Sequence, residues 1–227
     1  MKAWELLGET SAPDGTDIRL IRRDDEYVIL ANGKPLMSSR LHGSEEALAT
    51  LGCAEARAHE SPRVLVGGLG MGFTLRAVLE VLPSAATVIV AELVPAVIQW
   101  NREPLAAVAG YPLRDRRVRI QVADVGLTLR EHRDRFDAIL LDVDNGPAAF
   151  TVGANAGLYD NSGVAAAYAA LCPGGTLAVW SAWEDRKFEQ RLRYHGFTVN
   201  VERVRARLKK GGPRHTIFLA HKRPSTP

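Results

Sequence analysis

The sequence predicts an α/β fold in which a seven-stranded, mostly parallel sheet ends in an antiparallel hairpin and follows a small amino-terminal β-hairpin region. From Arg63 onward, near-continuous apolar segments alternate with amphipathic segments, which is typical of a parallel sheet covered by helices on both faces. Near the carboxyl end, two further β segments flank the turn sequence LKKGGP, and this arrangement predicts an antiparallel pair.

The amino-terminal part of the chain predicts a small β region. Asn32 and Gly33 lie between two apolar runs, which is a strong hairpin signal. The predicted elements are β segments at 17–23, 26–31 and 34–39, and then a helix at 43–58 with Ser44 as its N-cap. We therefore divide the chain of 227 residues into a small β region, 1–42, and a second domain, 43–227.

The second domain alternates strands and helices. The predicted strands are 63–68, 86–93, 117–124, 136–144, 174–182, 197–207 and 214–221, and the predicted helices are 73–82, 95–103, 127–132, 163–171 and 184–195. A Rossmann-like parallel sheet with a terminal antiparallel hairpin is the architecture of class I enzymes that use S-adenosylmethionine (SAM). The pattern alone therefore predicts the class I SAM-methyltransferase fold.

Composition and charge narrow the class of protein. Hydrophobic residues make up 46% of the chain and charged residues 24%, and the net charge of +3 is too small to demand a polyanionic partner. Cys53 and Cys172 have no disulfide or zinc spacing, and the six histidines are scattered, so we expect no metal site. The start is not leader-like and no apolar run could span a membrane, so the expected location is the cytoplasm.

Basic residues gather in the stretch Arg203–His215. They alternate as in a strand, so a solvated sheet edge explains them, and the lack of interleaved aromatic residues argues against nucleic acid binding. The expected partner is a small-molecule acceptor. No pattern demands an oligomer, and a homodimer is left open.

Four glycines, Gly67, Gly68, Gly70 and Gly72, stand where the first strand of the second domain meets its helix. Such a turn needs residues without a Cβ, and the helix start offers free N–H groups to a ligand. The dinucleotide fingerprint G-x-G-x-x-G lacks its last glycine here because Phe73 follows. The remaining G-x-G-x-G spacing is that of SAM-type sites.

Acidic residues end the next three strands. Glu92 follows the glycines by about twenty residues, the distance at which a carboxylate accepts the ribose hydroxyls. Asp124 ends the third strand, and Asp142 and Asp144 end the fourth. Helix capping explains any single acid about equally well, but the set together favours a nucleoside site. The predicted cofactor-binding residues are Gly67, Gly68, Gly70, Gly72, Glu92, Leu93, Asp124 and Val125.

Several segments resemble the spermidine synthase-like group: SEEALA, GGLGMGFTLR, VAEL, RVRIQVADV and ILLDVDNGPAAF. The resemblance runs from about Asn32 to His221. It implies that Glu92 binds the ribose, that Asp124 contacts the adenine, and that Asp142 takes the catalytic position with Asp144 beside it.

The chain also departs from that group. Gly70 stands where aminopropyltransferases carry an aspartate, Ser44 and Glu45 replace a Tyr-His pair, and the loop after Asp142 is shorter. The loop aspartate suits decarboxylated SAM, which ends in an ammonium, and a glycine there favours intact SAM, which ends in an amino acid.

The leading interpretation is methyl transfer from SAM to a small molecule by in-line attack, with Asp142 orienting and deprotonating the nucleophile. The first alternative is aminopropyl transfer from decarboxylated SAM to a polyamine, with another acid, from the amino-terminal region, replacing the loop aspartate. The second alternative is a non-catalytic nucleoside-binding or scaffold protein.

Overall fold

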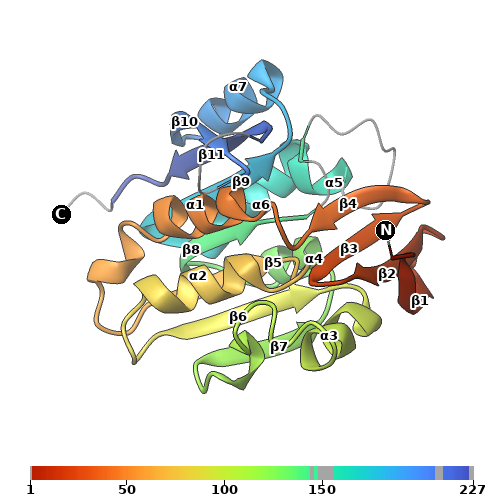
Figure 1. Ribbon diagram of the computed structural model, residues 1–227. Coiled ribbons are helices and arrows are strands. Elements are labelled where there is room, and N and C mark those ends of the chain that lie inside the picture. The colour runs from red at the N-terminus through yellow and green to blue at the C-terminus, as the bar shows by residue number, and fades with distance from the viewer. Residues whose placement is uncertain (1, 144–145, 148–155, 208–211, 225–227) are drawn as a thin grey trace.

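The computed structural model (Figure 1) describes residues 2–143, 146–147, 156–207 and 212–224. Its main sheet has seven strands in the order β10-β11-β9-β8-β5-β6-β7. The strands are β5 (Arg63–Gly67), β6 (Thr87–Glu92), β7 (Val118–Val122), β8 (Phe136–Leu141), β9 (Leu171–Ser181), β10 (Thr198–Arg205) and β11 (Arg214–His221). Strands β5 to β9 pair in parallel, whereas β11 is antiparallel to both β9 and β10. The predicted fold class is confirmed.

Helices cover both faces of this sheet because strand side chains point alternately to the two faces. Val64 and Val66 pack in one core with α1, α2 and α3, while Leu65 packs in a second core with α4, α6 and α7. The helices are α1 (Gly43–Gly52), α2 (Phe73–Val81), α3 (Pro95–Arg102), α4 (Val125–Arg130), α5 (Ala156–Tyr159), α6 (Asn161–Ala170) and α7 (Arg186–Tyr194), with short 3-10 turns η1 (Ala56–Ala58) and η2 (Pro112–Arg114). Among the described residues, no helix has the length and apolar character needed to cross a membrane.

The amino-terminal region is larger than the predicted hairpin. It forms a four-stranded antiparallel sheet of β1 (Glu5–Ser11), β2 (Asp17–Arg23), β3 (Glu26–Ala31) and β4 (Lys34–Ser38). The prediction missed β1 because none of its residues is fully buried, so no apolar run marks it. Ile18, Leu20 and Ile29 join the core beneath α1, α2 and α3. The domain boundary at residue 42 stays a prediction, and α1 begins at Gly43.

The first helix of the second domain is shorter than predicted. It ends at Gly52 rather than continuing to Ala58, and the 3-10 turn η1 follows it. Ser44 is not its N-cap. His42 holds that position, and its side chain accepts no capping hydrogen bond from the backbone of the helix. The Ser44 hydroxyl instead donates to Glu45 at 2.7 Å. Ser44 therefore supports the Glu45 side chain instead of capping the helix.

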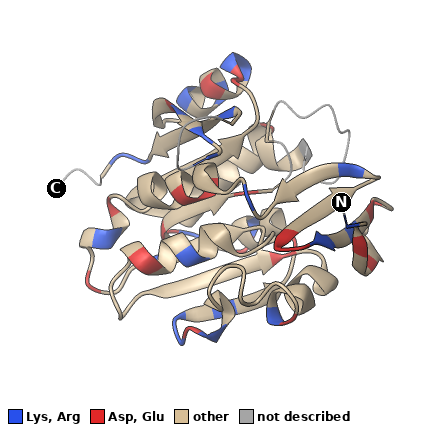
Figure 2. Cartoon of the chain, viewed as in Figure 1, with Lys and Arg blue, Asp and Glu red and all other residues tan. Residues whose placement is uncertain are grey.

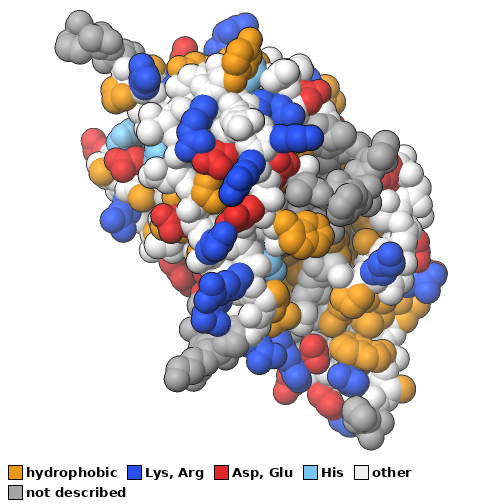
Figure 3. Space-filling view, turned by 90° about the horizontal axis from the view of Figure 1, so that it is seen from above, with side chains coloured by type: hydrophobic (Ala, Val, Ile, Leu, Met, Phe, Trp, Pro, Cys, Tyr) orange, Lys and Arg blue, Asp and Glu red, His pale blue; other side chains and the backbone are white. Residues whose placement is uncertain are grey.

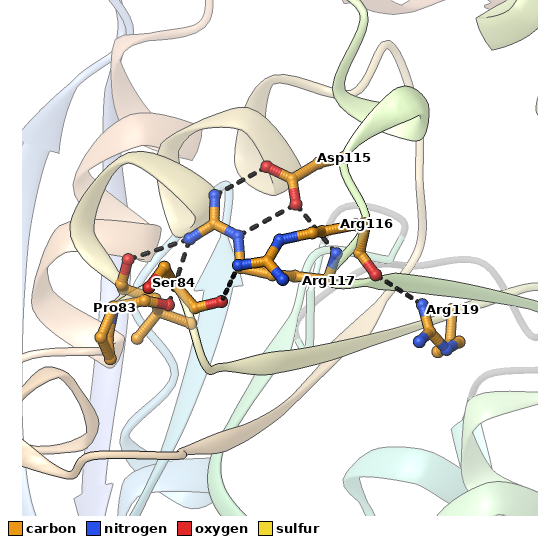
Figure 4. A network of polar contacts seen from close by, with 7 residues as sticks. Pro83, Ser84, Asp115, Arg116, Arg117 and Arg119 are labelled. Atoms are coloured by element: carbon orange, nitrogen blue, oxygen red, sulfur yellow. Dashed lines mark hydrogen bonds and ion pairs between the residues drawn. The ribbon is translucent and has the colours of Figure 1, made fainter.

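A polar network ties the loop after α2 to the segment before β7, at the edge where the parallel strands begin (Figure 4). The Arg117 guanidinium donates to the two carboxylate oxygens of Asp115 at 3.0 and 2.8 Å. It also donates to the carbonyl oxygens of Leu82 and Pro83 at 2.9 and 3.3 Å. The hydrogen bonds from Arg117 lower the pKa of the Asp115 carboxyl to about 2. The network therefore holds two connections of the sheet together at the edge where the strands begin.

We expect Asp115→Asn to lower the free energy of unfolding at pH 7 by about 1–2 kcal/mol, because the Arg117 cation loses its charged partner. The folded-state pKa of Asp115 is lowered, so its stabilisation is present above pH 4 and is lost as the pH falls toward 2. Urea unfolding between pH 7 and pH 2.5 measures this, with Asp25→Asn on an exposed turn as the control. A constant difference between wild type and Asp115→Asn over that range would refute the assignment.

Candidate active site

The glycine loop between β5 and α2 packs directly against the end of β8. Gly68 and Gly72 have positive φ angles of 86° and 85°. A Cβ on Gly68 would lie 2.4 Å from the backbone oxygen of Asp142, and one on Gly72 would lie 2.8 Å from the side-chain oxygen of Asn101. These positions therefore need glycine for close approach as well as for backbone geometry.

Glu92, at the end of β6, fastens this loop to its own strand. Its Oε2 accepts a hydrogen bond from the backbone N–H of Leu69 at 2.9 Å, and its Oε1 accepts one from that of Val94 at 2.8 Å. The residue is only 7% exposed, and burial raises the pKa of its carboxyl although these bonds act in the opposite direction. The predicted contact with a ribose stays a prediction, and each oxygen keeps a second lone pair for it.

Asp124 caps the helix that follows it. Its Oδ1 accepts from the backbone N–H of Gly126 at 2.6 Å and from that of Leu127 at 3.3 Å, so α4 starts at Val125, earlier than predicted. Val125 is buried, and a Cβ on Gly67 would lie 2.8 Å from its Cγ2, so this glycine allows α4 to approach β5. The contact of Asp124 with an adenine stays a prediction.

Leu93 and Asp144 are two further residues that the sequence predicted for the site. Leu93 is half-buried against the core beneath α1, α2 and α3. Asp144 lies outside the described residues, so its predicted role beside Asp142 has no geometry here. Within the part of the chain that the structure describes, no group of three or more His, Cys, Asp or Glu side chains is arranged to hold a metal ion.

Asp142 follows β8 and meets α2. The Thr74 hydroxyl, in the first turn of α2, donates to Asp142 Oδ2 at 2.6 Å. Burial raises the pKa of the Asp142 carboxyl to about 6, while the bond from Thr74 works against that rise. The predicted catalytic carboxyl therefore lies at the edge of the sheet with one oxygen fixed by a neutral donor.

Glu45 is the acid that the sequence reading did not place in the site. It lies in the first turn of α1 and is only 6% exposed. Burial, and after it repulsion from Asp142, raises the pKa of the Glu45 carboxyl to about 8. The two carboxyl groups are thus close enough to titrate together.

A signal for Glu45 was present in the sequence. Glu45, Leu48, Ala49 and Gly52 are buried and follow the spacing of one helix face. An acid within an apolar helix stripe is costly unless it has a use, because an ionised carboxylate loses hydration there. The sequence analysis noted Glu45 as part of the pair that replaces a Tyr-His pair and gave it no role in the site.

Two side-chain contacts join α1 and its N-cap residue to the glycine-loop helix α2, and a third ties the N-cap residue to α1 itself. The His42 ring stacks on Phe73 with centroids 4.2 Å apart. Glu46 forms ion pairs with Arg76 and with His42. Figure 2 shows these neighbouring helices with acidic positions on α1 and both signs of charge on α2. Glu46 is therefore paired with basic side chains, whereas no Lys, Arg or His of the described residues pairs with Glu45.

Two further polar contacts involve Tyr159 and Arg203. The hydroxyl of the buried Tyr159 donates to the Val143 carbonyl oxygen at 3.2 Å. Arg203 pairs with Glu184 at the sheet edge. Figure 3 shows blue and red side chains interspersed on this face. A depression of about 510 Å³ between α7 and β10 contains none of the predicted site residues.

Solved structures with the same arrangement identify the fold. The chain matches a spermidine synthase in complex with the transition state analogue AdoDATO at a TM-score of 0.76 and 22% identity, covering 97% of this chain and 74% of that one. A spermidine synthase from Thermotoga maritima matches at 0.72 and 19%, covering 97% and 73%. The chain has a spermidine synthase-like fold.

Further comparisons agree with this fold. A probable spermidine synthase from Corynebacterium glutamicum matches at a TM-score of 0.65 and 20% identity, covering 95% of this chain and 79% of that one. Polyamine aminopropyltransferases from Thermoanaerobacter sp. and Thermoanaerobacter pseudethanolicus are 30% identical over 120 residues. That segment is 52% of this chain and 41% of each relative, so the chain matches less than half the length of these relatives. No family model matches the chain.

The prediction of methyl transfer is wrong in the light of these relatives, which are named for aminopropyl transfer and spermidine synthesis. They favour the alternative, aminopropyl transfer. The error came from weighing Gly70 alone, since a glycine loop without an acid argues for intact SAM. The structure brings an acid, Glu45, to Asp142 from α1 instead. A spermidine synthase-like fold can therefore bring a second carboxyl group to this edge without an aspartate in the glycine loop.

The buried acid predicts a pH dependence of stability in the ligand-free protein. The folded-state pKa of Glu45 lies above its ordinary value of 4.5, so its contribution is fully present below that value and is lost as the pH rises through about 8. We expect Glu45→Gln to remove this loss and to stabilise the protein at pH 9 by on the order of 2 kcal/mol.

Urea unfolding of wild type and Glu45→Gln from pH 5.5 to pH 9 measures the difference. Glu55→Gln, an exposed position shortly after α1, makes the same charge change outside the site. Parallel pH profiles for wild type and Glu45→Gln would contradict the burial of an ionisable Glu45.

Proposed function

We propose that this chain transfers the aminopropyl group of decarboxylated SAM to an amine acceptor. The observation that carries the proposal is the pair of carboxyl groups Glu45 and Asp142 at the carboxyl edge of the sheet, each with a raised pKa. Among the described residues, neither forms an ion pair with Lys, Arg or His. The names of the similar proteins support the same reaction.

The charge of the pair suits the substrates of this reaction. Decarboxylated SAM and an alkyl diamine each present an ammonium group, and a nearby cation favours the ionised form of both acids. The carboxylate of intact SAM would instead add a third negative charge to Glu45 and Asp142. The residues present therefore fit decarboxylated SAM better than intact SAM.

The nucleoside part would be held by the residues that the sequence predicted. Glu92 lies at the end of β6 for the ribose hydroxyls, and Asp124 lies at the end of β7 for the adenine. Because β6 lies between β5 and β7 in the sheet, Glu92 lies between Asp124 and the glycine loop, which leads into α2. Its close packing on Asp142 would bring the sulfonium end toward that carboxyl.

Asp142 has the chemistry of a general base in this arrangement. When bound, decarboxylated SAM supplies an aminopropyl carbon bonded to a sulfonium, which is a good leaving group. Asp142 accepts a proton from the acceptor ammonium, and the neutral nitrogen bonds to that carbon while the carbon–sulfur bond breaks and its electron pair stays on sulfur. The hydrogen bond from Thr74 keeps the carboxyl oriented during proton transfer.

The function is tested by incubating the protein with decarboxylated SAM and a panel of alkyl diamines, and by measuring aminopropylated amine and methylthioadenosine by mass spectrometry. We expect turnover in wild type. We expect Asp142→Asn to lower kcat by 10²–10⁴-fold and to change the affinity for methylthioadenosine less than twofold. The rise of the wild-type rate with pH, near the Asp142 pKa of about 6, should disappear in this variant.

Thr50→Val, which removes an exposed hydroxyl on α1, is the control for a change outside the site. Binding of methylthioadenosine without turnover on any diamine would reject the proposal and favour a non-catalytic nucleoside-binding protein. Equal turnover by wild type and Asp142→Asn would reject the role of this carboxyl.

Glu92 gives a separate test of the nucleoside site. If its carboxylate accepts both ribose hydroxyls, wild type should bind methylthioadenosine at least tenfold more tightly than its 2′,3′-dideoxy analogue. Glu92→Gln should lose that preference, which calorimetric titration of both ligands measures. An unchanged preference in Glu92→Gln would show that Glu92 only anchors the glycine loop.

A further inference from the structure

The glycine loop carries no acidic side chain, because position 70 is a glycine and the end of the Met37 side chain lies directly over it. A Cβ on Gly70 would lie 2.8 Å from Cε and 2.9 Å from Sδ of Met37, which reaches over the loop from β4. The backbone N–H of Met71 also donates to Met37 Sδ at 3.2 Å. A thioether thus fills this space, so any anion that meets a substrate ammonium must come from another element.

Glu45 is the acid that α1 brings to the same edge. Its side chain is buried on the inner face of the helix, in line with Leu48, Ala49 and Gly52. The contacts of α1 with α2 hold it there, because the neighbouring Glu46 pairs with Arg76 and His42 stacks on Phe73. Thr74 of α2 in turn bonds to Asp142, so the two acids are fixed relative to each other.

A buried chain of hydrogen bonds supports the charged form of Glu45. The Ser44 hydroxyl, which is 0% exposed, donates to Glu45 Oε2 at 2.7 Å. Nδ1 of His215, at the start of β11, lies 2.9 Å from Ser44 Oγ. With the proton on Nδ1, both hydrogen bonds of this series are donated in the direction of Glu45. That arrangement stabilises a carboxylate rather than a carboxylic acid.

The surroundings of His215 favour a neutral ring. Its ring packs edge-on against Trp180 with centroids 4.6 Å apart. Burial lowers the pKa of His215, so a neutral ring that donates through one nitrogen is the favoured form. The hydrogen bonds from His215 and Ser44 therefore support the Glu45 side chain without placing a competing cation beside it.

From this arrangement we infer that Glu45 is the specificity-determining carboxylate that binds the alkylammonium group of a substrate, and that Ser44 and His215 position it. The inference rests on the proposed function, and it adds a residue and a ligand chemistry to that site. A charge-assisted hydrogen bond from the ammonium to Glu45 would replace the hydration that burial removes. The alkylammonium belongs either to decarboxylated SAM or to the amine acceptor, and the two are distinguished by titration.

The experiment is a calorimetric titration of wild type and Glu45→Gln with three ligands: decarboxylated SAM, 1,4-diaminobutane and the neutral methylthioadenosine. We expect Glu45→Gln to weaken the binding of one or both cations at least tenfold and to change the affinity for methylthioadenosine less than twofold. The cation whose binding is weakened identifies the source of the ammonium. Glu55→Gln, with the same charge change, should bind all three ligands as wild type does.

Ser44→Ala provides a second variant that removes only the supporting hydroxyl. We expect it to weaken binding of the same cation threefold or more and to leave methylthioadenosine binding unchanged. Unchanged cation affinity in Glu45→Gln, an equal loss for the neutral nucleoside, or a wild type that binds neither cation would each overturn the inference. If Glu45→Gln does not fold, Ser44→Ala decides by the same criteria.

The outcome is separable from that of the proposed function. Turnover in wild type combined with unchanged cation binding in Glu45→Gln would reject the role of Glu45 and keep the reaction. A loss of cation binding in Glu45→Gln without turnover in wild type would reject the reaction and keep Glu45 as an ammonium-binding residue.

Discussion

Carboxyl groups buried without a cation at one edge of the sheet are the constraint on which the site depends. Glu45 and Glu92 are buried and Asp142 is half-buried, and neutral donors bond to them: the Ser44 and Thr74 hydroxyls and the backbone N–H groups of Leu69 and Val94. Neutral donors offset part of the cost of burial but leave the pKa of each acid raised. The edge is therefore poised for a positively charged ligand.

At the opposite edge of the sheet, acidic side chains are paired with cations. Asp115 pairs with Arg117, and Asp134 pairs with Lys222, where the parallel strands begin. Asp137 accepts from the backbone N–H of Arg63 and contacts His59. Acids at this edge connect strands and loops, whereas Glu45 and Asp142 at the carboxyl edge have no cationic partner among the described residues. The division agrees with the general rule for open α/β sheets, in which ligands bind outside the carboxyl ends of the strands.

Local pattern in the sequence was enough to predict the parallel sheet, because strands buried on both faces read as continuous apolar runs, as in Val64–Val66. The same reasoning placed Glu92 and Asp142, since each directly follows such a run. It missed β1, whose residues are only partly buried, and it could not place Glu45 beside Asp142, because that contact depends on how α1 packs on α2. Met37 over Gly70 is likewise a contact between distant segments, and no local pattern reports it.

A single substituted position, such as Gly70 in the glycine loop, does not by itself determine which ligand a site prefers. A ligand responds to the electrostatic potential of its whole site, and in a poorly hydrated pocket a carboxylate on any neighbouring element contributes to it. Met37 lies over Gly70, and α1 supplies Glu45 with its own hydrogen-bonded support. Because the fold brings β4, α1 and α2 together at one point, the acid can come from a different element while the sign of the charge offered to a substrate stays the same.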